Sequence, residues 1–140
     1  MSRDEKLDHL KSVPLFERLG HRELERLGQL ADEVEVGLDD VLTRQGQTGQ
    51  EFFIVLDGHV TVLDGTKPIA HLGQGDFFGE IALIEDRPRT ATVRADGITR
   101  LLVIPHREFH AFMDEFPEVR RAVMAALADR VRRLESNRAD

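Results

Sequence analysis

Glycine is concentrated in the middle of this chain, and its distribution restricts the folds that the chain can adopt. Of the 11 glycines, all but Gly20 and Gly28 lie between Gly37 and Gly97. Glycine supplies the positive φ angles of tight turns and weakens the interior of a helix. The distribution therefore predicts a turn-rich middle, which is typical of short strands, between two helical ends.

The middle of the chain alternates short apolar runs with turn residues. The expected strands span residues 52–56, 60–62, 69–72, 90–95 and 98–104. Asp57-Gly58 and Asp64-Gly65 are flanked by β-forming residues and predict hairpins, and Asp96-Gly97 joins the last two strands. Many short antiparallel strands with close turns favour a sandwich, a barrel or a jelly roll.

Both ends of the chain carry apolar residues at helical spacing. These residues are Leu24, Leu27 and Ala31 at the N-terminal end, Phe109, Phe112, Met113 and Phe116 near the C-terminal end, and Val119, Val123, Leu127, Val131 and Leu134 in a final stripe. Pro117 interrupts the C-terminal pattern and is expected to open a second helix as its first residue. The length of 140 residues fits one domain, so we expect a mainly β (α+β) domain with helical ends over residues 1–140.

The composition excludes several classes of protein. The chain has no cysteine, which rules out a disulfide scaffold and a cysteine-ligated zinc site. No apolar run approaches the ~18 residues of a membrane-spanning helix, and no secretory signal is present, so we expect a cytoplasmic protein without membrane contact. The formal net charge of -7 disfavours direct binding to nucleic acid.

Residues 78–93 carry the groups that best fit a ligand site. Gly79 lets a ligand approach the backbone, and residues 80–84 can form a helical turn whose free amides attract an anion. Arg89 follows a proline and supplies a permanent positive fork that suits phosphate oxygens. The Glu80 carboxylate accepts hydrogen bonds, which suits a sugar hydroxyl. Together these groups describe a site for a sugar phosphate.

The same segment closely resembles the phosphate-binding cassette of cyclic-nucleotide-binding domains. The match comprises Phe78-Gly79-Glu80-Ile81-Ala82-Leu83, a spacer, and Pro88-Arg89-Thr90-Ala91-Thr92. Elsewhere the comparable positions are Val13-Pro14-Leu15-Phe16, which looks like the family's entry motif, Gly46, residues 53–58, Gly73 and Gly75. The resemblance implies an antiparallel jelly-roll barrel over 32–104 with the cassette at 78–93, N-terminal helices within 1–31, and two C-terminal hinge and lid helices within 106–140.

The resemblance also implies a role for each matching residue. Arg89 would pair with the cyclic phosphate, while Glu80 and the Gly79 amide would hold the ribose 2′-hydroxyl. The other implied ligand-binding residues are Ile81, Ala82, Thr90 and Ala91 of the cassette, with the amides of Ala82 and Thr90 facing the phosphate, and Val62, Ile69 and Leu72 as an apolar wall around the base. We expect cyclic AMP as the preferred ligand. In relatives a hydroxyl at the position of Thr90 can meet the 2-amino group of guanine, so cyclic GMP is expected as a second possible ligand.

The implied function is regulatory: the domain binds a cyclic nucleotide and signals by moving the helices after Pro105. No catalytic residue, metal or further cofactor is expected. The partner would be a second copy of the chain or an effector protein that contacts those helices. The chain has no tryptophan or tyrosine to stack on the base, which predicts an aliphatic cap and a modest affinity. The initial methionine favours a free-standing module over a fragment of a longer protein.

The sequence leaves two alternative functions open. A family-like fold without a ligand could act as a protein-interaction module, and the presence of Glu80 and Arg89 argues against it. A small cupin-like metalloenzyme would need a histidine cluster, but no His-x-His pair with a following glutamate occurs. The sequence also lacks a nucleophile elbow and a Ser-His-Asp order.

Overall fold

The computed structural model describes residues 2–79, 88–125 and 128. The chain forms two compact units, one within Gln29–His110 and one within Met1–Gly28 and Ala111–Asp140. None of the helices in the described ranges is long and apolar enough to cross a membrane. The expectation of one domain over residues 1–140 stays a prediction.

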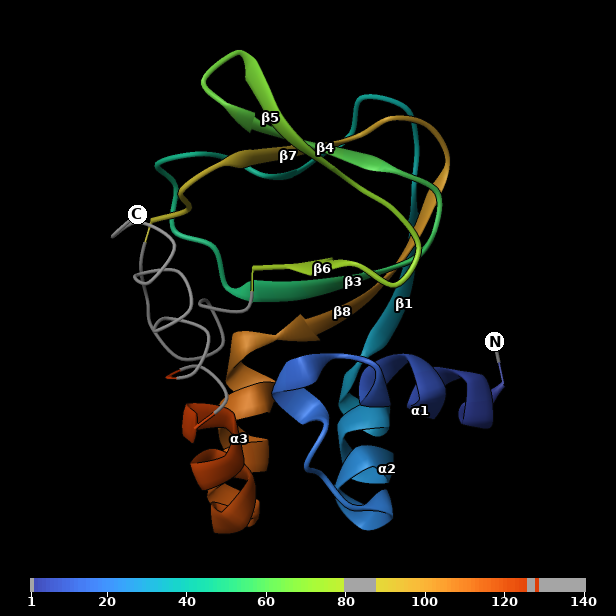
Figure 1. Cartoon of the computed structure of the whole chain (residues 1–140), viewed down its shortest axis with the longest axis vertical. Helices are drawn as coiled ribbons and strands as arrows, with labels where there is room; N and C mark the ends of the chain where they lie inside the picture. The colour runs from blue at the N-terminus through green and yellow to red at the C-terminus, as the bar shows by residue number, and fades with distance from the viewer. Residues whose placement is uncertain (1, 80–87, 126–127, 129–140) are drawn as a thin grey trace, which may run out of the picture. The chain divides into compact units, whose positions relative to one another are not determined.

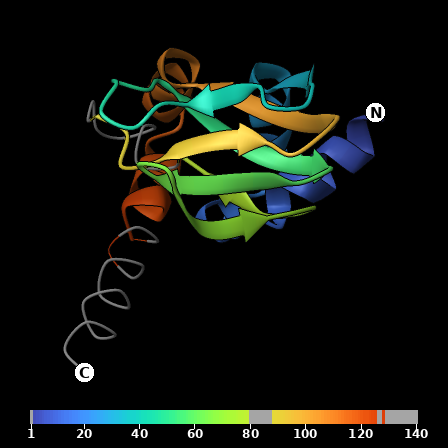
Figure 2. The ribbon, with the colours of Figure 1, turned by 90° about the horizontal axis from the view of Figure 1, so that it is seen from above.

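The unit within Gln29–His110 is built from two antiparallel four-stranded sheets (Figure 1). One sheet has the order β1-β8-β3-β6, with β1 at Asp32–Val36, β8 at Thr99–Pro105, β3 at Glu51–Asp57 and β6 at Phe77–Phe78. The other has the order β2-β7-β4-β5, with β2 at Val41–Thr43, β7 at Thr92–Ala95, β4 at Val60–Asp64 and β5 at Lys67–Leu72 (Figure 2). Antiparallel strands with helical ends confirm the expected fold class, and the arrangement is consistent with a jelly roll.

The two predicted hairpin turns have different outcomes. Asp64-Gly65 does close a hairpin, since β4 and β5 pair antiparallel and Asp64 lies opposite Lys67. The prediction at Asp57-Gly58 is wrong, because β3 and β4 belong to different sheets. Asp96-Gly97 likewise joins β7 and β8 across the two sheets. An Asp-Gly pair indicates a sharp change of direction, and it does not determine which strands become neighbours.

The interior of the barrel is an apolar cluster contributed by both sheets. Its buried members are Phe53, Val55, Val60, Phe78, Val93, Leu101 and Val103, and the half-buried Val36, Leu42, Val62 and Leu72 pack against it. The Phe53 and Phe78 rings stack with centroids 4.8 Å apart, which fixes β6 beside β3. Burial of each large apolar side chain contributes about 1.5–3 kcal/mol, so this cluster stabilises the barrel substantially.

At the edge of the first sheet, β1 is exposed and acidic, and it is held partly by charge. The carboxylate of Glu33 accepts a hydrogen bond from Arg100 Nε on β8 at 3.0 Å. This hydrogen bond, together with the charge of Glu33, raises the pKa of Arg100 above its ordinary value. The guanidinium therefore remains charged, and the contact links the edge strand to its neighbour.

The helices lie in the sequence where they were expected. The helical elements are α1 at Arg3–Lys11, a 3-10 turn at Pro14–Phe16, α2 at His21–Leu30, α3 at His106–Glu115, and a further helix over residues 117–125. The apolar face predicted near the C-terminal end is confirmed, because Phe109, Phe112, Met113 and Phe116 are all buried. Pro117 opens the next helix as predicted, and Val119 and Val123 on it are fully buried. Leu127, Val131 and Leu134 lie outside the described residues.

Candidate functional site

A cavity of about 150 Å³ lies in the barrel unit beside Arg89. Its lining residues are Thr43, Val62, Phe78, Gly79, Arg89, Thr90, Ala91 and Val93. Gly79, Arg89, Thr90 and Ala91 come from the segment that the sequence singled out, and Val62 comes from the expected apolar wall. The fold therefore brings five of the predicted residues around one space.

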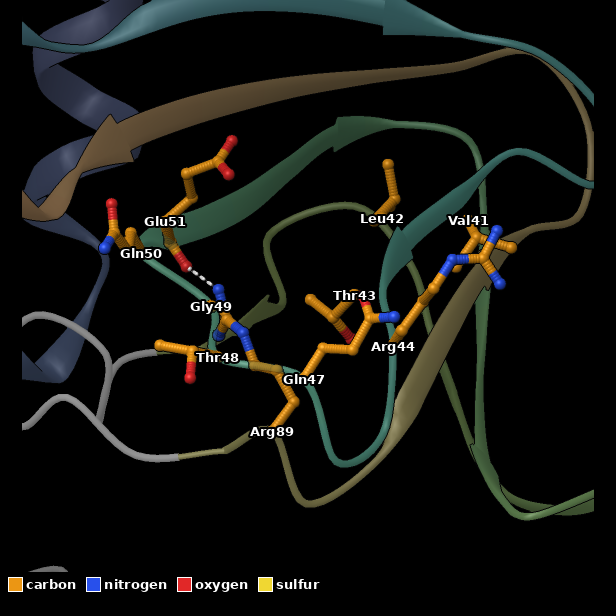
Figure 3. A pocket seen from close by; sticks show the side chains of 10 residues that line it. All are labelled: Val41, Leu42, Thr43, Arg44, Gln47, Thr48, Gly49, Gln50, Glu51 and Arg89. Atoms are coloured by element: carbon orange, nitrogen blue, oxygen red, sulfur yellow. Dashed lines mark hydrogen bonds between the residues drawn. The ribbon is translucent and has the colours of Figure 1, made fainter.

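A second cavity, of about 320 Å³, also borders Arg89 (Figure 3). It is lined by Val41, Leu42, Thr43, Arg44, Gln47, Thr48, Gly49, Gln50, Glu51 and Arg89. Apart from Arg89, these residues belong to β2, to the connection from β2 into β3, and to the start of β3 at Glu51. Arg89 and Thr43 line both cavities, so the two spaces adjoin the same pair of side chains. No residue of this connection was predicted from the sequence as part of the site.

The backbone of Arg89 is fixed by the connection between β2 and β3. The amide of Arg89 donates to the carbonyl oxygen of Gln47, and the amide of Gly46 donates to the carbonyl oxygen of Arg89, both at 2.8 Å. Thr48 forms an antiparallel bridge with Pro88 next to them. The arginine thus lies in a short two-stranded ladder, which determines where its side chain starts.

The Arg89 side chain is half-buried and extends along this connection toward the start of β3. Its Nη2 atom donates to the backbone carbonyl of Glu51 at 2.6 Å (Figure 3). Gly79 lies on the path of the guanidinium with φ +82°, and a Cβ atom there would be 2.5 Å from Arg89 Nη1. Position 79 therefore requires glycine for two reasons: its backbone is left-handed, and the arginine side chain occupies the space that a Cβ atom would take.

The described residues that line the smaller cavity carry a positive charge. Of the described residues that line it, Arg89 alone carries a charge, and Val62, Phe78 and Val93 give it an apolar wall. A guanidinium stays protonated at every physiological pH and presents its N–H groups in a planar fork. A cavity with one such cation on an apolar wall suits an anionic ligand that also has an apolar portion.

The remaining predicted site residues are not all at this cavity. Ile69 is 54% exposed, because it alternates along β5 with Ala70 and Leu72, which are the partly buried residues of that strand. Leu72 packs against the apolar cluster inside the barrel without lining the cavity. Glu80, Ile81 and Ala82 lie outside the described residues.

Within the described ranges, no group of three histidine, aspartate or glutamate residues is placed to hold a metal ion. His106 and His110 lie on α3 with ring centroids 4.2 Å apart.

Comparisons with known proteins identify the family of the chain. Residues 33–116 match the family described as "Cyclic nucleotide-binding domain", a span that includes both cavities. A cAMP-dependent protein kinase regulatory subunit from Mycosarcoma maydis is 38% identical over 106 residues, which cover 71% of this chain and 20% of that protein. A cGMP-dependent protein kinase from Drosophila melanogaster is 37% identical over 122 residues, which cover 81% of this chain and 13% of that protein.

The structural comparison covers nearly the whole chain. The N-terminal domain of a transcriptional regulator from Streptomyces coelicolor A3(2) superposes with a TM-score of 0.84 and 28% sequence identity. The match covers 93% of this chain and 94% of that domain. In contrast, the chain spans only about a fifth or less of the two kinase relatives. The family match and the structural match together show that this chain belongs to the cyclic nucleotide-binding domain family.

Proposed function

We propose that the chain binds a cyclic nucleotide in the smaller cavity, with cyclic AMP preferred, and that Arg89 pairs with the cyclic phosphate. The observation that carries this proposal is the position of Arg89, the one charged side chain among the described residues that line a mostly apolar cavity. A cyclic nucleotide combines a phosphate anion with a flat base, and these two portions match the cation and the apolar wall. Arg89 donates N–H groups to phosphate oxygens, an arrangement that gives short and strong hydrogen bonds.

The ribose and the base are assigned to neighbouring residues. Gly79 lines the cavity, and its amide together with Glu80 would hold the 2′-hydroxyl of the ribose. Val62 lines the cavity on the apolar side and contacts the base in this arrangement. Thr90 lines the same space, and its hydroxyl gives cyclic GMP a contact through the 2-amino group of guanine.

The role of the domain is regulatory and not catalytic in this proposal. Ligand binding would favour one arrangement of the helix that begins at Pro117, because only interactions that differ between two states can shift their populations. A second copy of the chain or an effector protein would then read that arrangement. Support comes from the break at Phe116-Pro117, where α3 ends and the next helix begins.

Isothermal titration of the whole chain with cyclic AMP and cyclic GMP tests the proposal directly. Arg89→Ala should weaken binding by about 2–5 kcal/mol, on the order of 30-fold or more, because it leaves the phosphate without its charged partner. Arg44→Ala is the matched control, since it removes the same charge from a residue that lines only the larger cavity. No heat with either nucleotide, or an Arg89→Ala affinity within twofold of wild type, would overturn the proposal.

A further inference from the structure

Gly49 is in closer contact with the Arg89 side chain than any larger residue would permit. A Cβ atom at position 49 would lie 1.6 Å from Arg89 Nε, 2.3 Å from Cζ and 2.5 Å from Nη2. The backbone of Gly49 is not left-handed, so its conformation is open to other residues. Glycine is therefore required at this position by the space that the arginine takes and not by the backbone.

The guanidinium passes between two glycines from different parts of the chain. Gly49 faces Nε and Nη2, and Gly79 faces Nη1, where its added Cβ would lie 2.5 Å away. The end of the side chain is held at the same time by the hydrogen bond from Nη2 to the Glu51 carbonyl. These contacts together fix both the position and the plane of the guanidinium.

The connection that contains Gly49 also holds the backbone of Arg89. Gln47 accepts from the Arg89 amide, and Gly46 donates to the Arg89 carbonyl. Residues 46–51 thus contact Arg89 at its backbone, along its side chain and at its tip. A flexible arginine loses rotamer freedom when it binds a ligand, and a side chain that is already ordered loses less.

We propose that Gly49 is the positioning residue for Arg89: its bare Cα forms the surface on which the guanidinium is held in place for the cyclic phosphate. This inference rests on the function proposed above. A methyl group at position 49 would push the arginine out of its place between the two glycines. A guanidinium has five N–H donors, so Arg89 can keep its bond to Glu51 while it donates to a phosphate.

The test is a double-mutant cycle on the whole chain, with cyclic AMP affinity measured by isothermal titration. Gly49→Ala should weaken binding by about tenfold or more in the wild-type background. In the Arg89→Ala background the same change should alter the affinity by less than about twofold, because the arginine that it displaces is absent. Gly97→Ala is the matched control, since a Cβ at Gly97 meets no atom within 4 Å.

A second measurement needs no ligand. In heteronuclear NMR spectra of the unliganded protein, Gly49→Ala should shift the Nε–Hε signal of Arg89, and Gly97→Ala should leave it in place. Arg89→Lys assigns that signal by removing it. An unshifted signal in Gly49→Ala would overturn the inference, whatever the affinity.

The outcomes separate this inference from the proposed function. The role of Gly49 would be refuted if Gly49→Ala lowered the affinity equally in the wild-type and Arg89→Ala backgrounds, or if Gly49→Ala bound with wild-type affinity. In either case the proposed function would still stand as long as Arg89→Ala weakens nucleotide binding. A wild-type protein that binds neither nucleotide would refute the proposed function, and the NMR signal would still decide where Gly49 places the arginine. If Gly49→Ala does not fold, the Gly49→Ala/Arg89→Ala variant should fold because the clash is removed, and its failure to fold would also refute the inference.

Discussion

The hydroxyl of Thr61 donates to the carboxylate of Asp96, with Oγ1 2.8 Å from both carboxylate oxygens. Thr61 is a buried residue of β4, and Asp96 lies in the connection that crosses from β7 to β8 in the other sheet. The amide of Asp96 donates in turn to the carbonyl of His59, in the connection from β3 to β4. The two crossings between the sheets are therefore tied to each other and to β4 by hydrogen bonds.

Thr61→Val should lower the free energy of unfolding by about 1–3 kcal/mol, because valine keeps the shape and leaves the Asp96 carboxylate without this donor. Urea denaturation monitored by circular dichroism measures the change. Thr66→Val makes the same substitution in the exposed turn between β4 and β5 and should have little effect. Equal stability of the two variants would show that the Thr61 hydrogen bond does not stabilise the crossing.

Gly58→Ala should destabilise the fold more than Gly65→Ala. Both glycines have positive φ, +96° and +63°, so both substitutions strain the backbone by roughly 1–3 kcal/mol. Only at Gly58 would the new Cβ also meet backbone, 2.7 Å from the Ile98 carbonyl oxygen. Thermal unfolding of the two variants side by side measures the difference, and equal losses would mean that the Ile98 carbonyl can move aside without cost.

Thr90→Ala should lower the affinity for cyclic GMP and leave that for cyclic AMP nearly unchanged. The expected loss is about 0.5–1.5 kcal/mol, the usual net value of one neutral hydrogen bond, because only guanine carries the 2-amino group. Competition titrations with both nucleotides provide the measurement. Thr92→Val is a useful control: the Thr92 hydroxyl accepts from the Gln45 amide and does not line the cavity. The same loss for both nucleotides in Thr90→Ala would assign Thr90 a structural role.

Hydrogen exchange should detect the response of the last helix to the ligand. If cyclic AMP favours one arrangement of this helix, amides of residues 119–125 should exchange more slowly in its presence, together with that of Gly79. Amides of α1 provide the internal reference, because no response is expected there. Protection at Gly79 alone would leave binding intact and refute the proposed movement of the helix.

The sequence predicted local features of the fold better than the pairing of strands. Glycine after aspartate at positions 58 and 65 correctly indicated positive φ at both. Whether the chain then turns back into a hairpin or crosses to the other sheet depends on which distant strands it pairs with. The residues around the turn do not show that pairing. The strand β1 was not predicted, because its alternating glutamates give no apolar run. Such a pattern suits an exposed edge strand, and it can be recognised as one only when its pairing with β8, including the contact of Glu33 with Arg100, is known.

At the candidate site, too, the sequence revealed the residues of a local motif and missed those that depend on distant contacts. Gly79 and Arg89 could be found because they lie in one contiguous motif whose chemistry is visible in the residues themselves. Gly49 and Thr43 could not, since their importance comes from contacts with a segment far along the chain, such as the bond from the Thr43 hydroxyl to the Ala91 carbonyl at 3.0 Å. Ile69 was expected at the apolar wall from the family resemblance alone. The structure leaves it exposed, because it alternates along β5 with Ala70 and with Leu72, which packs inside the barrel.

The pairing of β1 with β8 has a consequence for the way the protein is made. Asp32 lies opposite Val103, so the first strand of the barrel acquires this neighbour only after nearly the whole barrel has left the ribosome. Until then its backbone donors and acceptors on that side can bond only to water or to another chain. Pairings between segments so distant in sequence also slow folding, because the loop must close before the contacts form. The three acidic side chains of this strand, Asp32, Glu33 and Glu35, repel a second copy of the same strand, which protects the nascent chain from edge-to-edge association while it waits for β8.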